Sequence, residues 1–289
     1  MKYLVTGAGQ IGSQLVHDLT SQGHAVNCLR KSGKPVSGAT VFSGDVADRQ
    51  LLAQAVADCA AIFHCTHAPY DSRAWRELLP PAETAVMGTA VELGIPVVFP
   101  ESMYAFAGCS GPVMEGATPN PIEGKGQVRA ELLAARAAHE AQTVSVIAAD
   151  LVGPTATSAG SVITSTVLAP AKKGLPVIVL ADPDVQHSAT FIPDLSATMI
   201  FAAQHADELP TAINAPSVTH TLREWAYATG KKPPVWGVPN WPIQFLGRIN
   251  RMCFELAEIA PMWHSEFVLG SSSIPIEPSP WSEVVARSL

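Results

Sequence analysis

The sequence predicts an α/β protein built on a doubly wound parallel sheet, with a smaller lobe formed mainly by its C-terminal part. Three observations support this fold. Short runs rich in Val, Ile and Phe alternate with helical patterns, a glycine-rich turn follows the first run, and tryptophans gather toward the C-terminus. Strands that alternate with helices form a parallel sheet with helices on both faces.

The short apolar runs are the expected strands, and helix-period segments separate several of them. The expected strands are residues 2–6, 24–29, 39–43, 60–65, 96–100 and 143–149. The expected helices are residues 10–23, 48–59, 81–94 and 124–141, of which two end at the helix-stop residues Gly23 and Gly94. Residues 191–205 are expected to be a strand end that leads into a further helix.

The pattern of the chain changes after the last of these strands. Residues 153–190 are rich in glycine and proline, and five of the six tryptophans lie at or beyond Trp225. We therefore expect a dinucleotide-binding type of domain over residues 1–152 plus about 186–205. A substrate-binding lobe is expected over about 153–185 and 206–289.

Composition restricts the class of protein. The chain has 289 residues, of which 47% are hydrophobic and 15% charged, so it can bury a sizeable core. A net charge of −7 argues against nucleic acid or an anionic membrane as the main partner. The five cysteines are scattered without a C-x-x-C pair, as in reduced cytoplasmic proteins. We find neither a signal-peptide core nor an apolar stretch of the ~20 residues needed to span a bilayer, and we expect a cytoplasmic protein.

The turn after the first strand carries the clearest motif. VTGAGQIGSQLV contains G-x-G-x-x-G as Gly7, Gly9 and Gly12, with Gln10 and Ile11 between them. In such a turn the first glycine permits the tight bend and the second lets backbone approach a pyrophosphate. The third allows close helix–sheet packing. The loop predicts a dinucleotide site, and a glycine-rich turn of purely structural use is the alternative.

The choice of dinucleotide depends on the residues after the second strand. NAD sites usually place Asp or Glu there, whereas this chain has Arg30 and Lys31. Two cations suit a 2′-phosphate, so NADP is favoured over NAD, with a solvated loop as the alternative. Asp45 follows the third strand and either receives the adenine amino group or caps the next helix. Thr66 and His67 follow the fourth strand, at the edge where cofactor-contacting loops gather.

These motifs resemble the extended short-chain dehydrogenase/reductases, the NAD(P)-dependent epimerase/dehydratase group with a Rossmann domain. The stretches that carry the resemblance span most of the chain: VTGAGQIGSQLV, SGDV, FHCTHAPY, ESMYAF, GPVMEGATPNP, DLVGP and FIPDLSATMI. The glycine loop is one residue shorter than the usual G-x-x-G-x-x-G, as in atypical members. The resemblance implies hydride transfer at a carbonyl or carbinol carbon of a small-molecule substrate.

The resemblance also implies a set of catalytic residues. The family uses a Ser or Thr near the end of the fifth strand and a Tyr-x-x-x-Lys helix that passes a proton. Aligning that helix with GKGQVRAELL places Lys125 at the Tyr position and Arg129 at the Lys position. A guanidinium stays protonated in proteins, so Arg129 is expected to contact the cofactor ribose instead of relaying a proton. Tyr104, Lys125 and Ser102 are then the catalytic candidates, with a packed tyrosine and a solvated helix face as the alternative.

Other patterns are weaker. YATGK (227–231) spells Tyr-x-x-x-Lys, but Gly230 is expected to end that helix before Lys231. Glu123, Glu131 and Arg136 are expected to be solvated. His64 and His67 lack a third well-spaced ligand, so we expect no metal site.

Three hypotheses about function follow from the sequence, of which the weakest is a reductase of hydrophobic carbonyls, suggested by the tryptophan-rich second lobe. The first is an NADP-linked oxidoreductase or epimerase-like enzyme of the atypical extended type, with its substrate between the lobes. The second is a catalytically inactive NAD(P)H-binding regulator or sensor that lost its chemistry with the Tyr-x-x-x-Lys pair. We expect a small-molecule substrate, no nucleic-acid or membrane partner, and leave a homodimer open.

Overall fold

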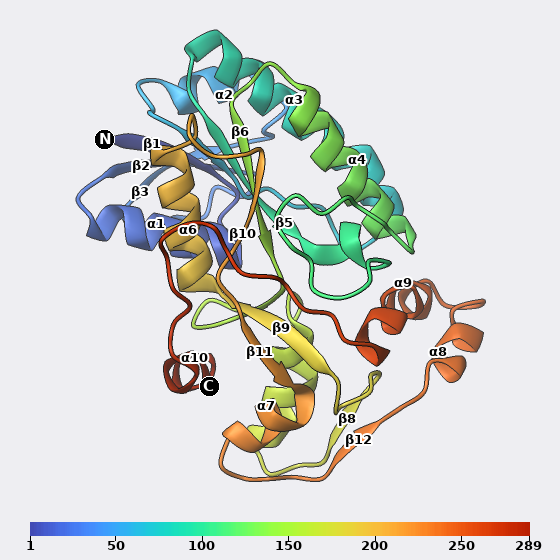
Figure 1. Ribbon diagram of the computed structural model, residues 1–289. Coiled ribbons are helices and arrows are strands. Elements are labelled where there is room, and N and C mark those ends of the chain that lie inside the picture. The colour runs from blue at the N-terminus through green and yellow to red at the C-terminus, as the bar shows by residue number, and fades with distance from the viewer.

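The computed structural model describes the backbone of residues 1–289 and all side chains except those of residues 251, 252 and 256. Its centre is a seven-stranded sheet in the order β10-β6-β5-β4-β1-β2-β3, with every neighbouring pair parallel (Figure 1). The strands are β1 (Lys2–Thr6), β2 (Ala25–Arg30), β3 (Ala39–Ser43), β4 (Ile62–His64), β5 (Val97–Ser102), β6 (Thr143–Ala148) and β10 (Ala212–Asn214). The predicted doubly wound parallel sheet is confirmed, and its strand order reverses between β1 and β4.

Helices cover both faces of this sheet. Helices α1 (Gln10–Ser21) and α6 (Ile192–Gln204) pack on one face, and α2 (Arg49–Val56), α3 (Ser72–Leu93) and α4 (Gly124–Ala138) lie on the other. Side chains alternate between the faces along each strand. Val5 and Phe63 join the core under α1 and α6, whereas Leu4 and Ile62 join the core under α2 and α3. The strands are therefore apolar on both sides, as a fully covered sheet requires.

The second lobe is built on two small sheets. One is three-stranded in the order β11-β9-β7, and the other pairs β12 with β8. Its strands are β7 (Asp150–Val152), β8 (Val177–Val179), β9 (Gln186–Phe191), β11 (Val218–Thr221) and β12 (Val235–Gly237). The helices of this part are η2 (Ile163–Leu168), α5 (Ala169–Lys172), α7 (Leu222–Ala228), α8 (Trp241–Leu246), α9 (Arg251–Ile259), η3 (Ala260–His264) and α10 (Trp281–Ser288). Trp225 and Trp263 belong to its buried core.

Two strands belong to other lobes than the expected domain boundaries assigned them to. Strand β9, expected in the first domain, pairs with β7 and β11 of the small sheet. Strand β10, expected in the second lobe, pairs with β6 of the large sheet, where it satisfies the edge that β6 would otherwise expose. The division into two domains therefore stays a proposal, with the large and small sheets as their centres.

Helix α3 is longer than the predicted helix at 81–94. It begins at Ser72, where the Asp71 carboxylate accepts hydrogen bonds from the N–H groups of Arg73 and Ala74. Pro80 and Pro81 lie inside it. Proline is disfavoured within a helix because it lacks an N–H, which is why the pattern placed the start at Pro81. The longer helix brings Trp75 to the site described next.

Candidate cofactor and substrate site

The glycine loop connects β1 to α1 at the reversal of the strand order. Gly7 has a φ of +80°, and a Cβ there would lie 2.8 Å from the carbonyl oxygen of Cys65. A Cβ on Gly12 would lie 1.9 Å from the carbonyl oxygen of Gly7. Both glycines are thus required by the chain's own packing. Among the residues that the structure describes, a Cβ on Gly9 would meet nothing within 4 Å, so the space above Gly9 is open for a group outside the protein.

The other two residues of the glycine loop face in different directions. Ile11 packs against the core under α1. Gln10 reaches the second lobe, where its side-chain oxygen accepts a hydrogen bond from the N–H of Thr157 at 3.1 Å. A Cβ on Gly160 would lie 2.5 Å from the Gln10 amide nitrogen. The loop after β7 therefore borders the glycine loop on one side.

The residues expected to determine the preference between NAD and NADP lie at the ends of β2 and β3. Lys31 Nζ is 3.1 Å from the Asp45 carboxylate, and both side chains are more than half exposed. Asp45 also accepts the N–H of Ala47, which, with the Lys31 charge, lowers the pKa of its carboxyl. Arg30 Nη1 donates to the carbonyl of Lys34 at 3.5 Å. The structure thus joins two of the expected cofactor contacts in a surface ion pair, which solvent keeps weak.

The loop after β4 lies against the glycine loop. Thr66 and Cys65 are the residues that a Cβ on Gly7 would strike. His67 Nδ1 donates to the carbonyl of Ala68 at 2.7 Å, so Nε2 is free to accept, and Arg129 Nη2 donates to it at 2.5 Å. Burial, and then the Arg129 charge, lower the pKa of His67 to about 4. The ring is therefore neutral at pH 7, and Arg129 on α4 is tied directly to the β4 loop.

Trp75 organises the aromatic part of the site. The Arg129 guanidinium lies 4.5 Å from its ring centroid. Three further rings surround it, those of His67 at 4.8 Å, Tyr70 at 5.7 Å and Tyr104 at 6.3 Å, the last stacked at 13°. Trp75 is 2% exposed. A single tryptophan of α3 thus fixes the relative positions of the β4 loop, the segment after β5 and helix α4.

The catalytic candidates after β5 lie around this cluster. Tyr104 belongs to a short 3-10 helix, η1 (Met103–Phe106), and its hydroxyl is 3.4 Å from the Tyr70 hydroxyl. Burial raises the pKa of Tyr104 to about 12. The Ser102 hydroxyl oxygen is buried and has no hydrogen-bond partner among the described residues. A neutral phenol and an unpaired hydroxyl are thus present in one segment.

Lys125 lies in a closed environment. Its side chain is 0% exposed, and Nζ donates to the carboxylates of Glu255 and of Glu258, the latter at 2.9 Å. Nζ also donates to the Glu255 carbonyl at 3.2 Å and lies 4.7 Å from the Tyr70 ring centroid. Helix α9 therefore covers the start of α4. Lys125 and Arg129 both face inward, unlike the solvated helix face that was the alternative reading.

Arg136, also on α4, has its side chain in the core. The expectation that this side chain is exposed to solvent is therefore wrong. It is 2% exposed and donates to both oxygens of Glu83 at 2.7 and 2.6 Å. Its Nη1 also donates to Glu101 at 2.8 Å and to the Ser145 hydroxyl at 3.1 Å. Glu101 in turn lies 3.4 Å from Arg129 Nε. Paired carboxylates from α3 and β5 make the burial of this charge tolerable.

Two further carboxylates have shifted pKa values. Glu123 caps α4 by accepting the N–H groups of Lys125 and Gly126, and burial raises the pKa of its carboxyl to about 7. Glu123, expected in solvent, is partly buried at this cap, whereas Glu131 pairs with Arg76 on the surface. Asp150 accepts hydrogen bonds from Ser161, Val162 and Ile163. Burial raises its carboxyl pKa to about 6.

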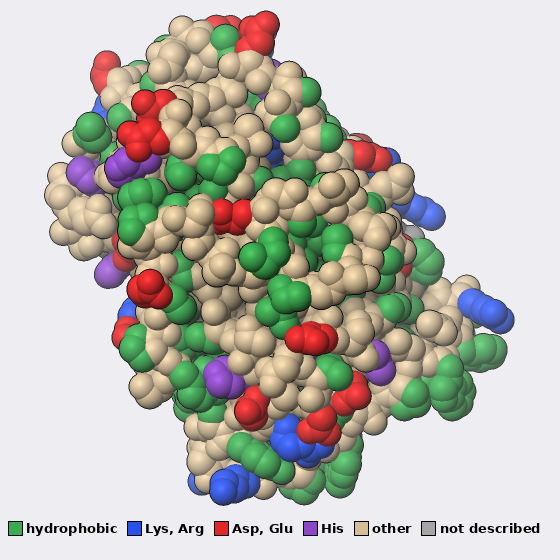
Figure 2. Space-filling model, in the orientation of Figure 1, with side chains coloured by type: hydrophobic (Ala, Val, Ile, Leu, Met, Phe, Trp, Pro, Cys, Tyr) green, Lys and Arg blue, Asp and Glu red, His purple; other side chains and the backbone are tan. Residues whose placement is uncertain are grey.

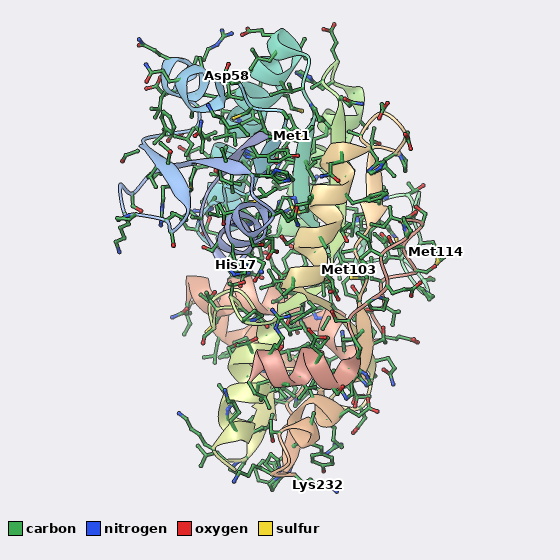
Figure 3. The ribbon with its side chains drawn as sticks, turned by 90° about the vertical axis from the view of Figure 1, so that its left-hand side faces the viewer. Met1, His17, Asp58, Met103, Met114 and Lys232 are labelled. Atoms are coloured by element: carbon green, nitrogen blue, oxygen red, sulfur yellow. The ribbon has the colours of Figure 1, made fainter. Side chains whose placement is uncertain are left out.

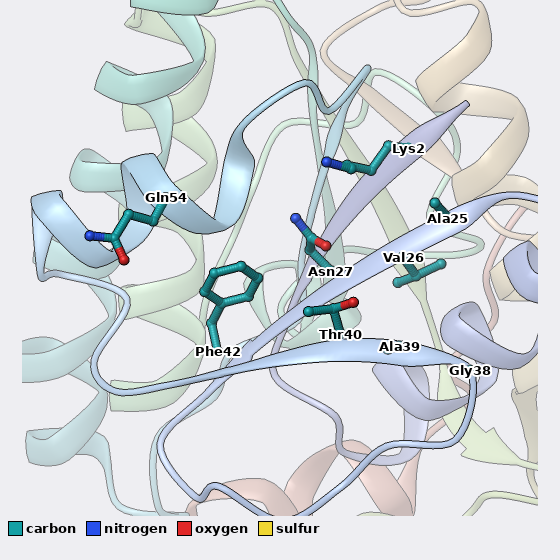
Figure 4. Close-up of a pocket in the computed structure, with 9 residues that line it drawn as sticks. All are labelled: Lys2, Ala25, Val26, Asn27, Gly38, Ala39, Thr40, Phe42 and Gln54. Carbon is teal, nitrogen blue, oxygen red and sulfur yellow. The ribbon is translucent and has the colours of Figure 1, made fainter.

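Several features lie outside this site. YATGK is not a helical pair, because α7 ends at Ala228 and Gly230 adopts a φ of +79°. Among the described residues, no three His, Cys, Asp or Glu side chains gather as metal ligands, and no helix could cross a membrane. A hollow of about 620 Å³ lies at the amino-terminal ends of β1, β2 and β3, the opposite edge from the glycine loop (Figure 4). It is lined by Lys2, Ala25, Val26, Asn27, Gly38, Ala39, Thr40, Phe42 and Gln54.

The fold and the glycine loop define a Rossmann-type α/β protein. Residues 3–94 match the model of the NAD dependent epimerase/dehydratase family. The resemblance to that family, expected from the motifs, is confirmed by this match. A search of curated protein sequences finds no matching relative.

Solved structures similar to the chain extend over nearly its whole length. UDP-glucose 4-epimerase of Thermus thermophilus, in complex with NAD, is 20% identical with a TM-score of 0.75, covering 100% of this chain and 97% of that one. WbmG of Bordetella bronchiseptica, in complex with NAD and UDP, is 18% identical with a TM-score of 0.76, covering 99% and 93%. UDP-glucose 4-epimerase of Thermotoga maritima, with UDP-glucose, is 16% identical with a TM-score of 0.75, covering 100% and 97%. At these identities the likeness establishes the fold.

Several residues of the site escaped the sequence analysis. Trp75, Glu101 and Glu255 are all buried and contact the candidate residues, yet none belongs to a local motif. Glu101 adjoins Ser102 in the ESMYAF segment. A carboxylate at the end of a buried strand indicates a cation or hydrogen-bond donor beside it, because charged side chains are rarely buried unpaired. Glu255 lies 130 positions from Lys125, a separation that no local pattern reveals.

Proposed function

We propose that the protein binds an NAD(P) dinucleotide at the carboxyl edge of its large sheet and catalyses hydride transfer at a carbonyl or carbinol carbon. The observation that carries the proposal is the contrast among the three glycines. Packing requires Gly7 and Gly12, whereas a Cβ on Gly9 would meet no atom of the described residues within 4 Å. The N-terminus of α1 next to Gly9 supplies N–H groups and the positive end of a helix dipole for a pyrophosphate.

The residues around the loop fit a bound dinucleotide. Gly9, Gln10, Ile11 and Gly12 would hold the pyrophosphate, and Thr66, His67 and Arg129 border the direction in which the nicotinamide half would extend. Arg30 and Lys31 support NADP over NAD, since the weak ion pair of Lys31 with Asp45 can be replaced by a 2′-phosphate. When bound, the nicotinamide would supply or accept the hydride.

Tyr104 is the proposed proton donor to the substrate oxygen. Its pKa of about 12 keeps the phenol protonated at neutral pH, so it can donate to a developing alkoxide. The Ser102 hydroxyl, buried without a partner among the described residues, would hold the same oxygen. Lys125 shares this role in our first hypothesis. Because Glu255 and Glu258 hold its ammonium group in this structure, α9 would have to move before Lys125 reached a substrate.

The binding step is tested by glycine substitutions with a matched control. Gly9→Val is expected to leave the melting temperature unchanged and to weaken NADH and NADPH binding at least tenfold, measured by fluorescence titration. Gly88→Val is the control, because a Cβ at Gly88 of α3 also meets nothing within 4 Å. Unchanged affinity in Gly9→Val contradicts the proposed site. Tighter binding of NAD than of NADP contradicts the role of Arg30 and Lys31.

The chemical step is tested with carbonyl substrates and with UDP-glucose, which a similar structure contains. Tyr104→Phe is expected to lower turnover by a factor of about 10² to 10⁴, the contribution usual for a general acid. Tyr227→Phe is the control, because this tyrosine belongs to α7 outside the aromatic cluster. Full turnover in Tyr104→Phe would remove it from the mechanism. Tight dinucleotide binding with no turnover on any compound would favour the inactive sensor.

A further inference from the structure

One end of the second lobe combines exposed apolar and cationic side chains. Helix α8 has no buried residue, and Trp241, Phe245 and Ile249 are 70%, 64% and 83% exposed. We name this end the basic apolar surface. Its exposed apolar members are Leu175, Ile178, Trp236, Trp241, Phe245, Leu246 and Ile249, and its exposed cations are Lys172, Lys173, Lys231, Lys232 and Arg248.

The small two-stranded sheet links the segments that carry these residues. Strands β8 and β12 pair in parallel with Trp236 opposite Ile178. Lys172, Lys173 and Leu175 immediately precede β8, Lys231 and Lys232 precede β12, and α8 follows β12. Figure 1 shows β8, β12 and α8 along one side of the second lobe, and Figure 2 shows hydrophobic side chains gathered there beside a cation. Lys232 lies at the end of the molecule far from Met1 and Asp58 (Figure 3).

Charge is distributed very unevenly along the chain. Residues 151–181 and 225–254 hold six of the 18 Lys and Arg residues and none of the 25 Asp and Glu residues. The basic apolar surface is drawn entirely from these two segments, although the net charge of the chain is −7. A net charge taken over the whole chain does not reveal this local excess of cations.

We propose that the basic apolar surface docks on an anionic lipid membrane. Trp and Phe side chains prefer the boundary between headgroups and acyl chains, and an apolar helix face can enter that boundary to a depth of about 5–10 Å. Each Lys or Arg near an anionic membrane strengthens binding about fivefold. Apolar side chains that the fold leaves 44–83% exposed gain a reason for their apolar character once lipid covers them.

The charges favour lipid over a second copy of the chain. A two-fold dimer through this surface would place the same patch against itself and so bring cations against cations. Exposed Leu246 and Ile249 fit acyl chains, whereas nucleic-acid surfaces are recognised mainly by stacking and hydrogen bonding. An anionic bilayer supplies both the negative charge and the apolar interior that this end of the lobe matches.

Flotation of the full-length protein with vesicles tests the proposal. We expect the protein to float with phosphatidylcholine vesicles that contain phosphatidylglycerol and to float at least tenfold less with phosphatidylcholine alone. Lys231→Gln with Lys232→Gln is expected to lower partitioning about 25-fold, and Phe245→Ser with Ile249→Ser at least tenfold. The controls are Lys34→Gln with Arg49→Gln, and Leu78→Ser with Leu93→Ser, which change exposed residues elsewhere.

The proposal is overturned by any of three results. These are no flotation with anionic vesicles, equal flotation with neutral vesicles, or equal losses in the control variants. Sedimentation velocity without lipid provides a further test, because a dimer that Phe245→Ser with Ile249→Ser dissociates would assign the surface to a second copy. Circular dichroism and the melting temperature establish that each variant is folded.

Discussion

Replacing Arg136 by methionine tests whether the charged face of α4 is a buried network. Methionine keeps an unbranched apolar side chain but leaves the carboxylates of Glu83 and Glu101 without their main cation. Removing one partner of a buried pair costs about 3–5 kcal/mol, because the remaining charge cannot reach water. With an m value of about 3 kcal/mol per M urea, the midpoint of unfolding should fall by about 1–1.7 M.

The matched control is Arg76→Met. Arg76 pairs with Glu131 at 3.1 Å, but both side chains are about half exposed, so the loss should stay below about 1 kcal/mol. Adding Glu83→Met to Arg136→Met removes one of the buried carboxylates that have lost their cation, and should recover part of the free energy of unfolding. Urea unfolding followed by circular dichroism measures all four proteins. Equal midpoints for Arg136→Met and Arg76→Met, or no recovery in the double variant, would refute the reasoning.

Three further predictions concern groups outside this network. A carboxyl pKa of about 7 in Glu123 means that the folded state binds its proton more tightly, so its contribution is lost as pH rises from about 4.5 to 7. In Glu123→Gln the free energy of unfolding should change less between these pH values, by no more than about 3 kcal/mol, when unfolding is measured as a function of pH. An unchanged dependence of the free energy of unfolding on pH contradicts the assignment. Asp48→Ala, which removes the cap of α2, should cost about 1 kcal/mol by thermal unfolding, and an unchanged melting temperature argues against the cap. Iodoacetamide should label Cys109 before Cys59, because burial raises the pKa of the Cys59 thiol to about 11; the reverse order by mass spectrometry contradicts this.

The strands and the glycine loop were predictable because their signals are local. Apolar runs mark β1 to β6 to within two residues at each end, and the spacing of Gly7, Gly9 and Gly12 specifies a strand–turn–helix. Helix α3 shows where local rules fail. Its capping residue Asp71 is a local start signal, but Pro80 and Pro81 argue locally against a helix that continues through them. Packing against the sheet compensates for hydrogen bonds that prolines cannot donate.

The buried charges were unpredictable because their partners are distant in sequence. Charged residues on a helix are usually solvated, and no local signal distinguishes Arg136 from them. Its carboxylate partners lie 53 and 35 positions away, and those of Lys125 lie 130 and 133 positions away. The alignment placed Lys125 and Arg129 on one helix, but only the three-dimensional arrangement shows what holds each of them.

Glu101 belongs at once to the framework and to the candidate site. One of its oxygens accepts from Arg136 in the core, and the other lies near Arg129 and accepts the N–H of Ser102. A protein engineer who altered Arg129 to change ligand preference would therefore also disturb a carboxylate on which Arg136 depends. Variants selected for new chemistry here should need compensating substitutions on α3 or α4. The substitutions that the core tolerates therefore limit how far the ligand preference of the site can change.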